Sequence, residues 1–435
     1  MNAGNDEALM TNDDWSPGMT KQRPERSHHS RDSEVRASSG IRHSPSAGGI
    51  IANNAQLAEL VKKIAPHQRI AIDTEADSLH CYREKLCLVQ ISLPAAEATA
   101  NPGNAADTPS RSDGEASTAD PRNAADTAAT TRRDFIVDPL ADVDLAPLRE
   151  VLEPKEIVLQ GADFDLRMLR RGFNFTAKKV FDTVIASRLL GIRAFSLAAL
   201  VKQYFEIELP KGSQKANWAQ RPLSARMAEY AINDTLYLLP LAEKLEAELD
   251  QAQRLDWFRQ SCQRAVEQAA MARVRDEEDV WRIRGSGALR GRPVVVLRAL
   301  WQWREKEAEA VDRPPFHILQ NHELLEAAED FASGKKPDFR HFSERRRVAF
   351  RHAAEQALQL PEDRWPIARR RFGTRPTAEQ VRRTEELRQR RDRAAKELKL
   401  EPAFVAPRGA LETLAADSTQ AEKLLVPWQR ELLGL

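Results

Sequence analysis

Two apolar runs joined by a short polar connection constrain the fold of this chain more than any other feature. Residues 69–74 and 86–93 have the length and the content of β-branched residues that are typical of buried strands. Because so short a connection brings the second run back alongside the first, an antiparallel hairpin is the simplest arrangement. The pattern therefore predicts a buried β-sheet in this part of the chain.

Two carboxylates lie at the end of the first predicted strand. Asp73 and Glu75 are two residues apart, and because strand side chains repeat every two residues, both point to the same face. Two like charges held so close repel each other unless a cation lies between them. Oxygen ligands at this spacing suit Mg²⁺ or Mn²⁺; the alternative is an acidic pair at a solvated strand end.

Length and composition indicate the broad class of protein. A chain of 435 residues is too long for one ordinary domain, and about two to four are expected. The three cysteines (Cys81, Cys87 and Cys262) lack metal-ligand spacing, which predicts reduced thiols in a cytoplasmic protein rather than a disulfide framework. We expect no membrane span and no secretory signal, because the chain has no apolar run of about 18 residues and no apolar signal segment.

Two segments are poor in apolar residues. Residues 1–50 are rich in Ser, Asn, Gly, Asp, Arg and His, and residues 95–133 are dominated by Ala, Asp, Thr, Pro, Asn and Gly. Neither segment can bury enough apolar surface to offset the entropy lost on ordering. We therefore predict a disordered N-terminal tail and a disordered insertion in a surface loop, which is tolerable because loop-closure entropy grows only logarithmically with length.

The remaining periodicity between residues 51 and 250 is mixed. Further strands are expected at 135–140 and 157–159, and helices at 54–64, 145–152, from about 163, 184–190, 195–205 and 223–249, the last of them kinked by Pro240. Strands come first, then strand and helix alternate, and helices end the region. This order predicts an α/β domain with a mixed sheet flanked by helices, spanning about 51–250.

Other acids and one phenol join the pair on the first strand. Asp165 falls near a predicted helix start, and Tyr230 and Asp234 are four residues apart, on one face of the last helix. Together with Asp73 and Glu75 these carboxylates could bind two divalent cations, which would stabilise the attacking and leaving oxygens of a phosphodiester. A tyrosine there could orient or deprotonate the attacking water.

Three spaced motifs resemble those of the DEDD exonucleases, in the subgroup with a tyrosine in the third motif. They are Asp73-Thr-Glu75, Gly161-x-x-x-Asp165-Leu and Tyr230-x-x-x-Asp234. The stretches 73–93, 217–224 and 229–240 are also similar to ribonuclease D. The resemblance covers about residues 51–250 and implies an RNase H-like fold. It also implies metal-dependent 3′→5′ exonucleolysis that releases nucleoside 5′-monophosphates.

Carried over by position, the resemblance makes Asp73, Glu75, Asp165 and Asp234 the metal ligands of a site for two cations, Mg²⁺ or Mn²⁺. Tyr230 would position the nucleophilic water. The second motif departs from the family in one respect, because Gln160 stands where relatives commonly have a histidine. That position is not one of the acidic ligands, so we expect the change to be tolerated.

Three residues near these motifs have competing interpretations. Asp163 is expected to be an N-terminal helix residue, favoured there by the helix dipole, and Asp182 to be the N-cap of the next helix. Either acid could instead be a metal ligand. Trp218 could stack on a base or pack in the core.

The C-terminal third contains an in-register repeat between residues 300–328 and 387–415. Leu300, Arg304, Ala308, Pro315, Leu324 and Ala328 correspond to Leu387, Arg391, Ala395, Pro402, Leu411 and Ala415. Each copy resembles the HRDC domain that follows the nuclease in ribonuclease D. We expect a helical linker over 251–288, an HRDC-like domain over 289–365 and a second, divergent HRDC-like domain over 377–435, both all-α.

Arginines cluster within these repeats, at 345–347, 369–371, 382–383 and 388–393. Basic clusters on helices attract phosphate backbones in a largely sequence-independent manner; the alternative is a solvated face paired with the neighbouring glutamates. The leading hypothesis is an exoribonuclease that trims the 3′ ends of structured RNA. In the family that the chain resembles, these RNAs are tRNA precursors. The alternatives are a 3′→5′ DNA exonuclease and a non-catalytic RNA-binding protein on the same fold.

Overall fold

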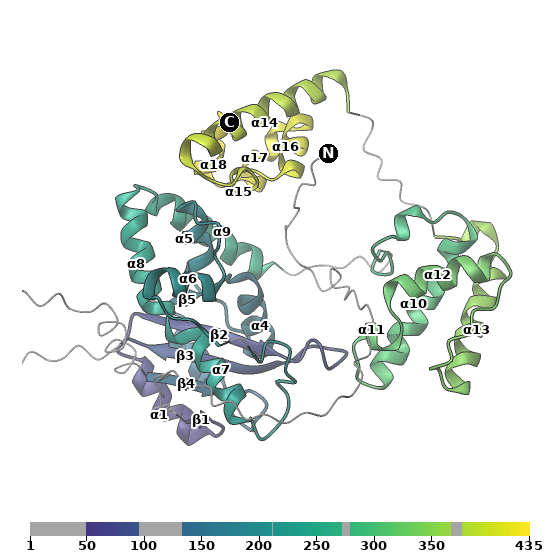
Figure 1. Cartoon of the computed structure of the whole chain (residues 1–435), viewed down its shortest axis with the longest axis horizontal. Coiled ribbons are helices and arrows are strands. Elements are labelled where there is room, and N and C mark those ends of the chain that lie inside the picture. Colours follow the sequence, from purple (N-terminus) through teal and green to yellow (C-terminus); the bar gives the residue numbers. More distant parts are fainter. Residues whose placement is uncertain (1–48, 95–132, 211, 272–278, 367–375) are drawn as a thin grey trace, which may run out of the picture. The chain divides into compact units, whose positions relative to one another are not determined.

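The computed structural model describes residues 49–94, 133–210, 212–271, 279–366 and 376–435. These residues divide into two compact units (Figure 1). The unit that we call the main body contains the described residues of 47–273 and of 370–435. The other unit contains those of 274–369. Residues 95–132 of the insertion predicted at 95–133 and nearly all of the predicted tail lie outside the described residues.

A six-stranded mixed sheet forms the centre of the main body, as the sequence predicts. Its order is β1-β4-β3-β2-β5-β6; β2, β3 and β4 pair antiparallel, and the other three pairings are parallel. The strands are β1 (Ile50–Ile51), β2 (Arg69–Ala76), β3 (Leu86–Leu93), β4 (Arg133–Val137), β5 (Glu156–Leu159) and β6 (Lys179–Asp182). The prediction assigned Ile50 to the tail, which was wrong, because Ile50 belongs to β1. The prediction also did not include β6.

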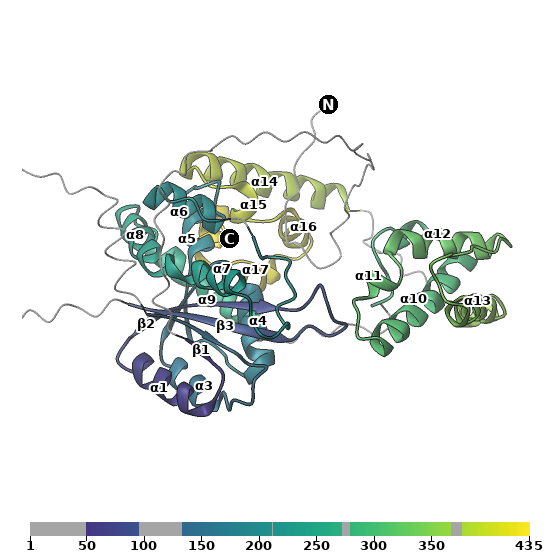
Figure 2. The same cartoon turned by 60° about the horizontal axis from the view of Figure 1, so that its bottom comes forward.

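Helices cover both faces of the sheet (Figure 2). On one face α1 (Asn54–Ile64), α3 (Ala146–Leu152) and α4 (Asp163–Phe173) pack on alternate strand residues such as Ile70 and Ile72. On the other face lie α5 (Thr183–Leu189), α6 (Leu197–Phe205), α7 (Ala225–Leu236) and α8 (Leu238–Gln251). Because β2 alternates between the two faces, Ala71, Asp73 and Glu75 point toward the second set of helices.

Local chemistry explains where the helices around the site begin. The side chain of Asp182 accepts hydrogen bonds from the amides of Val184 and Ile185, which confirms it as the N-cap of α5. Ser224 caps α7 in the same way. The single long helix expected over 223–249 is instead two helices that meet at Tyr237. Pro240 lies in the first turn of α8, where its missing N–H removes no intrahelical bond.

The expected linker over 251–288 contains a helix that belongs to the main body. Helix α9 (Leu255–Ala270) buries Phe258 and Cys262 in the core with α5 and α8, and Ala269 in the core with α4. The whole helix is therefore a structural part of this unit, which the sequence interpretation did not foresee. Among the described residues, no helix combines the length and the apolarity needed to cross a bilayer.

The two helical repeats begin with the same order of elements. The first repeat consists of α10 (Arg292–Ala310), α11 (Pro315–Ile318), α12 (Asn321–Ala332) and α13 (Glu344–Leu358). The second repeat consists of α14 (Ala378–Leu398), α15 (Pro402–Val405), α16 (Arg408–Ala416), α17 (Ala421–Leu424) and α18 (Pro427–Leu433). In both repeats a long helix leads to a four-residue helix that opens on a proline.

Equivalent residues of the repeats make equivalent contacts. Leu300 and Leu387, aligned from the sequence, are both buried. Arg304 donates to the carbonyl of Leu319, and Arg391 donates to the carbonyl of Ala406, the residue 15 positions further on in each case. The internal repeat expected from the sequence is therefore present in the structure.

The second repeat packs against the nuclease-like part of the main body. The indole of Trp428 stacks on that of Trp257 of α9, with ring centroids 5.1 Å apart. Arg254, at the start of α9, donates to the carbonyls of Leu189 and Leu398, the last residues of α5 and α14. The backbones also approach closely, since a Cβ on Gly191 would lie 2.6 Å from the carbonyl oxygen of Lys399.

Candidate active site

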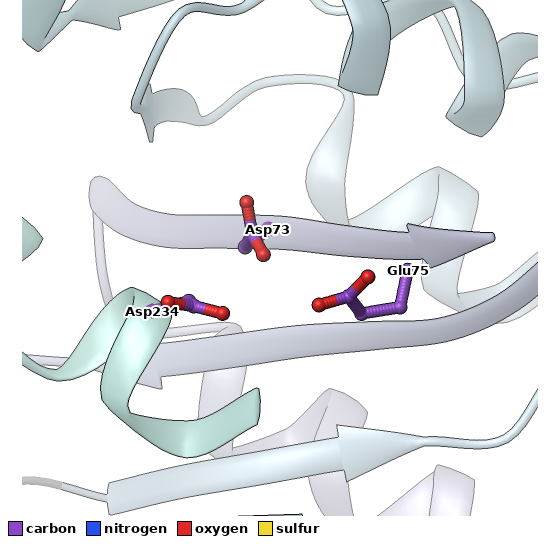
Figure 3. Close-up of side chains that lie close together, drawn as sticks. All are labelled: Asp73, Glu75 and Asp234. Carbon is purple, nitrogen blue, oxygen red and sulfur yellow. The ribbon is translucent and has the colours of Figure 1, made fainter. Parts of the chain in front are cut away.

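Three of the four expected carboxylates come together between the sheet and α7. Asp73, Glu75 and Asp234 each offer an oxygen, and these oxygens all lie within 4.8 Å of one another. Figure 3 shows Asp73 and Glu75 projecting from β2 and Asp234 from α7, with the Glu75 side chain extending toward the other two. The strand alternation that places Asp73 and Glu75 on one face is thus what the sequence predicted.

The fourth expected carboxylate, Asp165, approaches from the other side of β2. It lies in the first turn of α4 and is buried. The hydroxyl of Thr74 donates to its Oδ1 at 2.6 Å. Because Thr74 stands between Asp73 and Glu75, its side chain points to the face that α4 covers. Asp165 is therefore outside the cluster of three oxygens, although its charge acts on all three of the clustered carboxylates.

The carboxylates raise one another's pKa. Burial and the charges of Asp234 and Asp165 raise the pKa of Glu75 to about 9. Burial, followed by the charge of Asp165, raises the pKa of Asp234 to about 7, and burial raises that of Asp165 to about 7 despite the Thr74 hydrogen bond. The pKa of Asp73 is raised well above its usual range by burial and then by the other three acids.

The donor set of this cluster fits a divalent cation. Among the described residues, no lysine or arginine forms an ion pair with Asp73, Glu75 or Asp234. Half-buried carboxylates without a basic partner are destabilised by mutual repulsion, and a bound cation would remove that repulsion. Carboxylate oxygens are also the ligands that Mg²⁺ and Mn²⁺ prefer.

Tyr230 lies one helical turn before Asp234 on α7 and is half-buried. Burial and the charges of Asp234, Glu75 and Asp73 raise the pKa of its phenol. The hydroxyl is therefore protonated at neutral pH and can exchange hydrogen bonds with a water molecule.

Trp218 packs in the core beneath α7. Its side chain is 1% exposed and contacts the cluster that contains Met227 and Ala231, so stacking on a base is excluded. Arg221 forms a two-pronged ion pair with Asp138 and donates to the carbonyl of Trp218. These contacts fix the segment that leads into α7 and thereby the position of that helix on the sheet.

The two competing acids have structural partners. Asp182 also accepts hydrogen bonds from the amides of Gly161 and Ala162, at the start of the second motif. Asp163 is the first residue of α4 and pairs with Arg167. Gln160, the departure from the family pattern, donates to the carbonyl of Phe195. None of these three residues belongs to the acidic cluster.

The sequence interpretation missed two polar residues beside the cluster. Thr74, which holds Asp165, was treated only as a spacer between two acids. Gln90 of β3 pairs in register with Asp73 and is 0% exposed. The signal that could have identified Gln90 is a polar side chain inside an otherwise apolar strand.

Most described arginines of the predicted basic clusters have acidic or backbone partners. Arg345 and Arg346 pair with Glu307, Arg388 pairs with Glu385, and Arg391 pairs with Asp392. The cluster at 369–371 lies outside the described residues. The pairing favours the interpretation of solvated, charge-balanced faces for these clusters.

Comparison with known families assigns a class to this arrangement. Residues 49–109 and 122–250 match the 3′-5′ exonuclease family, and residues 295–331 match the HRDC domain. The unmatched residues 110–121 lie within the insertion predicted at 95–133. The chain therefore carries a 3′-5′ exonuclease domain followed by an HRDC domain.

The individual proteins that the chain resembles include several ribonucleases D. Ribonuclease D of Desulfotalea psychrophila is 26% identical over 64% of this chain and 66% of that protein. Ribonuclease D of Pseudomonas paraeruginosa is 29% identical over 54% of this chain and 65% of that protein. The crystal structure of Escherichia coli RNase D superimposes with a TM-score of 0.61 at 20% identity, covering 89% of this chain and 98% of that one. The resemblance to ribonuclease D is confirmed, and the sequence matches span slightly less than two thirds of these relatives.

Proposed function

We propose that this chain is a metal-dependent 3′→5′ exoribonuclease that trims the 3′ ends of RNA and releases nucleoside 5′-monophosphates. The observation that carries the proposal is the cluster of Asp73, Glu75 and Asp234 oxygens within 4.8 Å of one another. The cluster lies in a domain that matches the 3′-5′ exonuclease family. Intact acids in all three motifs argue against a non-catalytic RNA-binding protein.

Divalent metal use follows from this family and from the acidic donor set. We propose that Asp73, Glu75, Asp165 and Asp234 hold two cations, Mg²⁺ or Mn²⁺. When bound between carboxylates and a phosphodiester, such cations stabilise negative charge on the attacking and leaving oxygens. Asp165 would take part from its own side of β2, where Thr74 already fixes one of its oxygens.

Side chains of α7 and of the segment before it would position the nucleophilic water for this reaction. The protonated hydroxyl of Tyr230 would hold the nucleophilic water by a hydrogen bond, within reach of Asp234 one turn further along α7. The buried Trp218 and the Arg221–Asp138 pair keep α7 seated on the sheet. A misplaced helix would move both Tyr230 and Asp234, so this packing contributes to the geometry of the reaction.

RNA is the proposed substrate class because the matched relatives are ribonucleases. The E. coli structure is described as an exoribonuclease involved in structured RNA processing, and rat exosome complex component 10 is 28% identical over 65% of this chain and 29% of that protein. Precursors of tRNA are the proposed natural substrate. Arg383 and Arg393 of α14 are exposed and, among the described residues, have no acidic partner, so they are the arginines best placed to meet a phosphate backbone.

The test uses a 5′-labelled single-stranded RNA, the same strand as DNA, and the full chain with and without Mn²⁺ or Mg²⁺. We expect a ladder that shortens from the 3′ end, on RNA only and only with metal. Asp73→Asn should abolish cleavage, because it removes a charged ligand, and should retain folding and RNA affinity, because the side chain keeps its shape.

Other outcomes would redirect the proposal. Equal ladders on RNA and DNA would indicate a general 3′→5′ exonuclease. RNA retention in a gel shift without any ladder would favour the binding protein. Cleavage that survives Asp73→Asn would contradict the assignment of the site.

A further inference from the structure

Gln90 is a fully buried polar side chain beside the acidic cluster. It lies in the middle of β3 and is 0% exposed. Neither its amide nitrogen nor its amide oxygen has a hydrogen-bond partner among the described residues. An amide removed from water without a partner is unfavourable, and each such group in a folded protein calls for an explanation.

The strand register places Gln90 at the site. Gln90 is directly opposite Asp73 in the antiparallel pairing of β2 and β3, and directly opposite side chains of such a pair lie next to each other on one face. Two residues along β3, Ser92 donates to the hydroxyl of Thr235 in α7. Gln90 and Ser92 share a face, so α7 covers Gln90 as well.

The chemistry of Gln90 complements the cluster that it faces. Asp73 is surrounded by other acids, and among the described residues no cationic side chain pairs with it. An amide N–H₂ is a donor that can support a carboxylate without neutralising it, so it would not compete with a cation for the charge. Residues that hydrogen-bond to metal ligands in this way fix the orientation of the ligand.

We propose that Gln90 is a positioning residue for cation binding, and that its amide nitrogen donates to the Asp73 carboxylate when a cation occupies the cluster. The inference rests on the metal site of the proposed function and goes beyond it by naming the residue that orients Asp73. The amide, which has no partner among the described residues, would gain one when a cation fixes the Asp73 carboxylate. Gln90 would thus favour the metal-bound protein over the metal-free one.

Gln90→Leu tests this, because leucine has a similar volume and no polar atoms. In the absence of metal we expect the melting temperature of the variant to equal or exceed that of the parent, since an unpaired buried amide has been removed. In a thermal-shift titration with Mn²⁺, we expect the half-maximal concentration to rise about tenfold or more, the usual effect of losing a residue that orients a ligand. Stability and cation affinity would then change in opposite directions.

Ser92→Ala is the matched control on the same face of the same strand. The hydroxyl of Ser92 has partners in Thr235 and Asp134, so its loss should lower the melting temperature without metal. The Mn²⁺ midpoint should stay unchanged, because Ser92 pairs with no member of the cluster. Gln90→Met, with an unbranched apolar chain, repeats the main test if the leucine variant does not fold.

Two results would overturn the inference. An unchanged Mn²⁺ midpoint in Gln90→Leu would reduce Gln90 to a packing residue. A clear fall in the metal-free melting temperature of both apolar variants would show that the amide is already paired. Failure of the proposed function is separate: a parent protein that binds Mn²⁺ and degrades no RNA would leave the role of Gln90 intact.

Discussion

Arg313 of the first repeat is exposed, whereas the matching residue of the second repeat, Leu400, is 2% exposed. His317 and Phe404 differ in the same way, because the histidine is exposed and the phenylalanine packs against the core of the main body. We call the segments 312–317 and 399–404 the outer loops of the two repeats. Both begin with a residue at positive φ, Asp312 at 47° and Lys399 at 58°.

This contrast distinguishes two sets of residues in each repeat, those that pack inside it and those on its outer surface. The residues that pack inside each copy, such as Leu300 and Leu387, specify the helical unit itself. The residues on its outer loop specify what the unit contacts. Leu400 and Phe404 therefore belong to the core of the main body, whereas their counterparts in the first repeat, Arg313 and His317, are exposed.

The largest effect is expected for Leu400→Arg, which gives the second repeat the residue of the first. A charge at a 2% exposed position has no partner there, and we expect the free energy of unfolding of the main body to fall by about 3–5 kcal/mol. Urea denaturation followed by tryptophan fluorescence measures this change, because Trp257 and Trp428 stack at the contact. The released repeat should also become sensitive to protease.

Arg313→Leu is the reciprocal control in the first repeat. Because Arg313 is exposed, the substitution should change stability by no more than about 0.5 kcal/mol. A main body that is equally stable with Leu400→Arg would mean that the outer loop does not determine docking.

A smaller effect is expected for Arg254→Met. The variant loses both donors to the carbonyls of Leu189 and Leu398, where two helix C-termini concentrate partial negative charge. We expect a loss of about 1–3 kcal/mol in the free energy of unfolding. Arg259→Met on the same helix is the control, because Arg259 is exposed and has no partner among the described residues. Equal effects of the two variants would argue against bridging by Arg254.

The smallest of the three effects is stabilisation by metal, which should differ between the two units. Mn²⁺ should stabilise the main body, including the second repeat, by about 1.4 kcal/mol at ten times its dissociation constant, and should not stabilise the first repeat. Calorimetry that resolves the two unfolding transitions measures this. A shift of both transitions would contradict the division into two units.

The size of this metal effect should depend on pH. Folding raises the pKa of Glu75 to about 9 and those of Asp165 and Asp234 to about 7, so the metal-free folded state binds more protons than the unfolded chain above about pH 4. The contribution of these three carboxyl groups to the stability of the metal-free protein then falls as the pH rises toward 9. The stabilisation by Mn²⁺ should accordingly be larger at pH 8 than at pH 6.

Much of the sheet and the site could be predicted from the sequence, because both depend on short periodic patterns. The alternation that sends Asp73 and Glu75 to one face, and the helical spacing of Tyr230 and Asp234, are properties of local geometry. Strand β6 was missed because only two of its residues, Val180 and Phe181, are apolar, too few to show a period.

Features that depend on contacts distant in the sequence could not be predicted. Nothing local indicates that Thr74 holds Asp165, which is 91 residues away. Leu400 and Trp428 look like ordinary apolar residues of a small helical domain, and only their contacts with α5 and α9 show a larger core. Periodicity identifies a buried face, but it does not identify the partner that buries it.

The division of the chain has a consequence for its synthesis. The main body is assembled from residues before 274 and after 369, and the other unit lies between them in the sequence. Because domains fold as units while the chain leaves the ribosome, the separate helical unit can fold while the exonuclease domain still lacks the surface that covers Trp257. A chain that stops before residue 370 would lack the second repeat, and Trp257 of α9 would lose the indole of Trp428 that stacks on it.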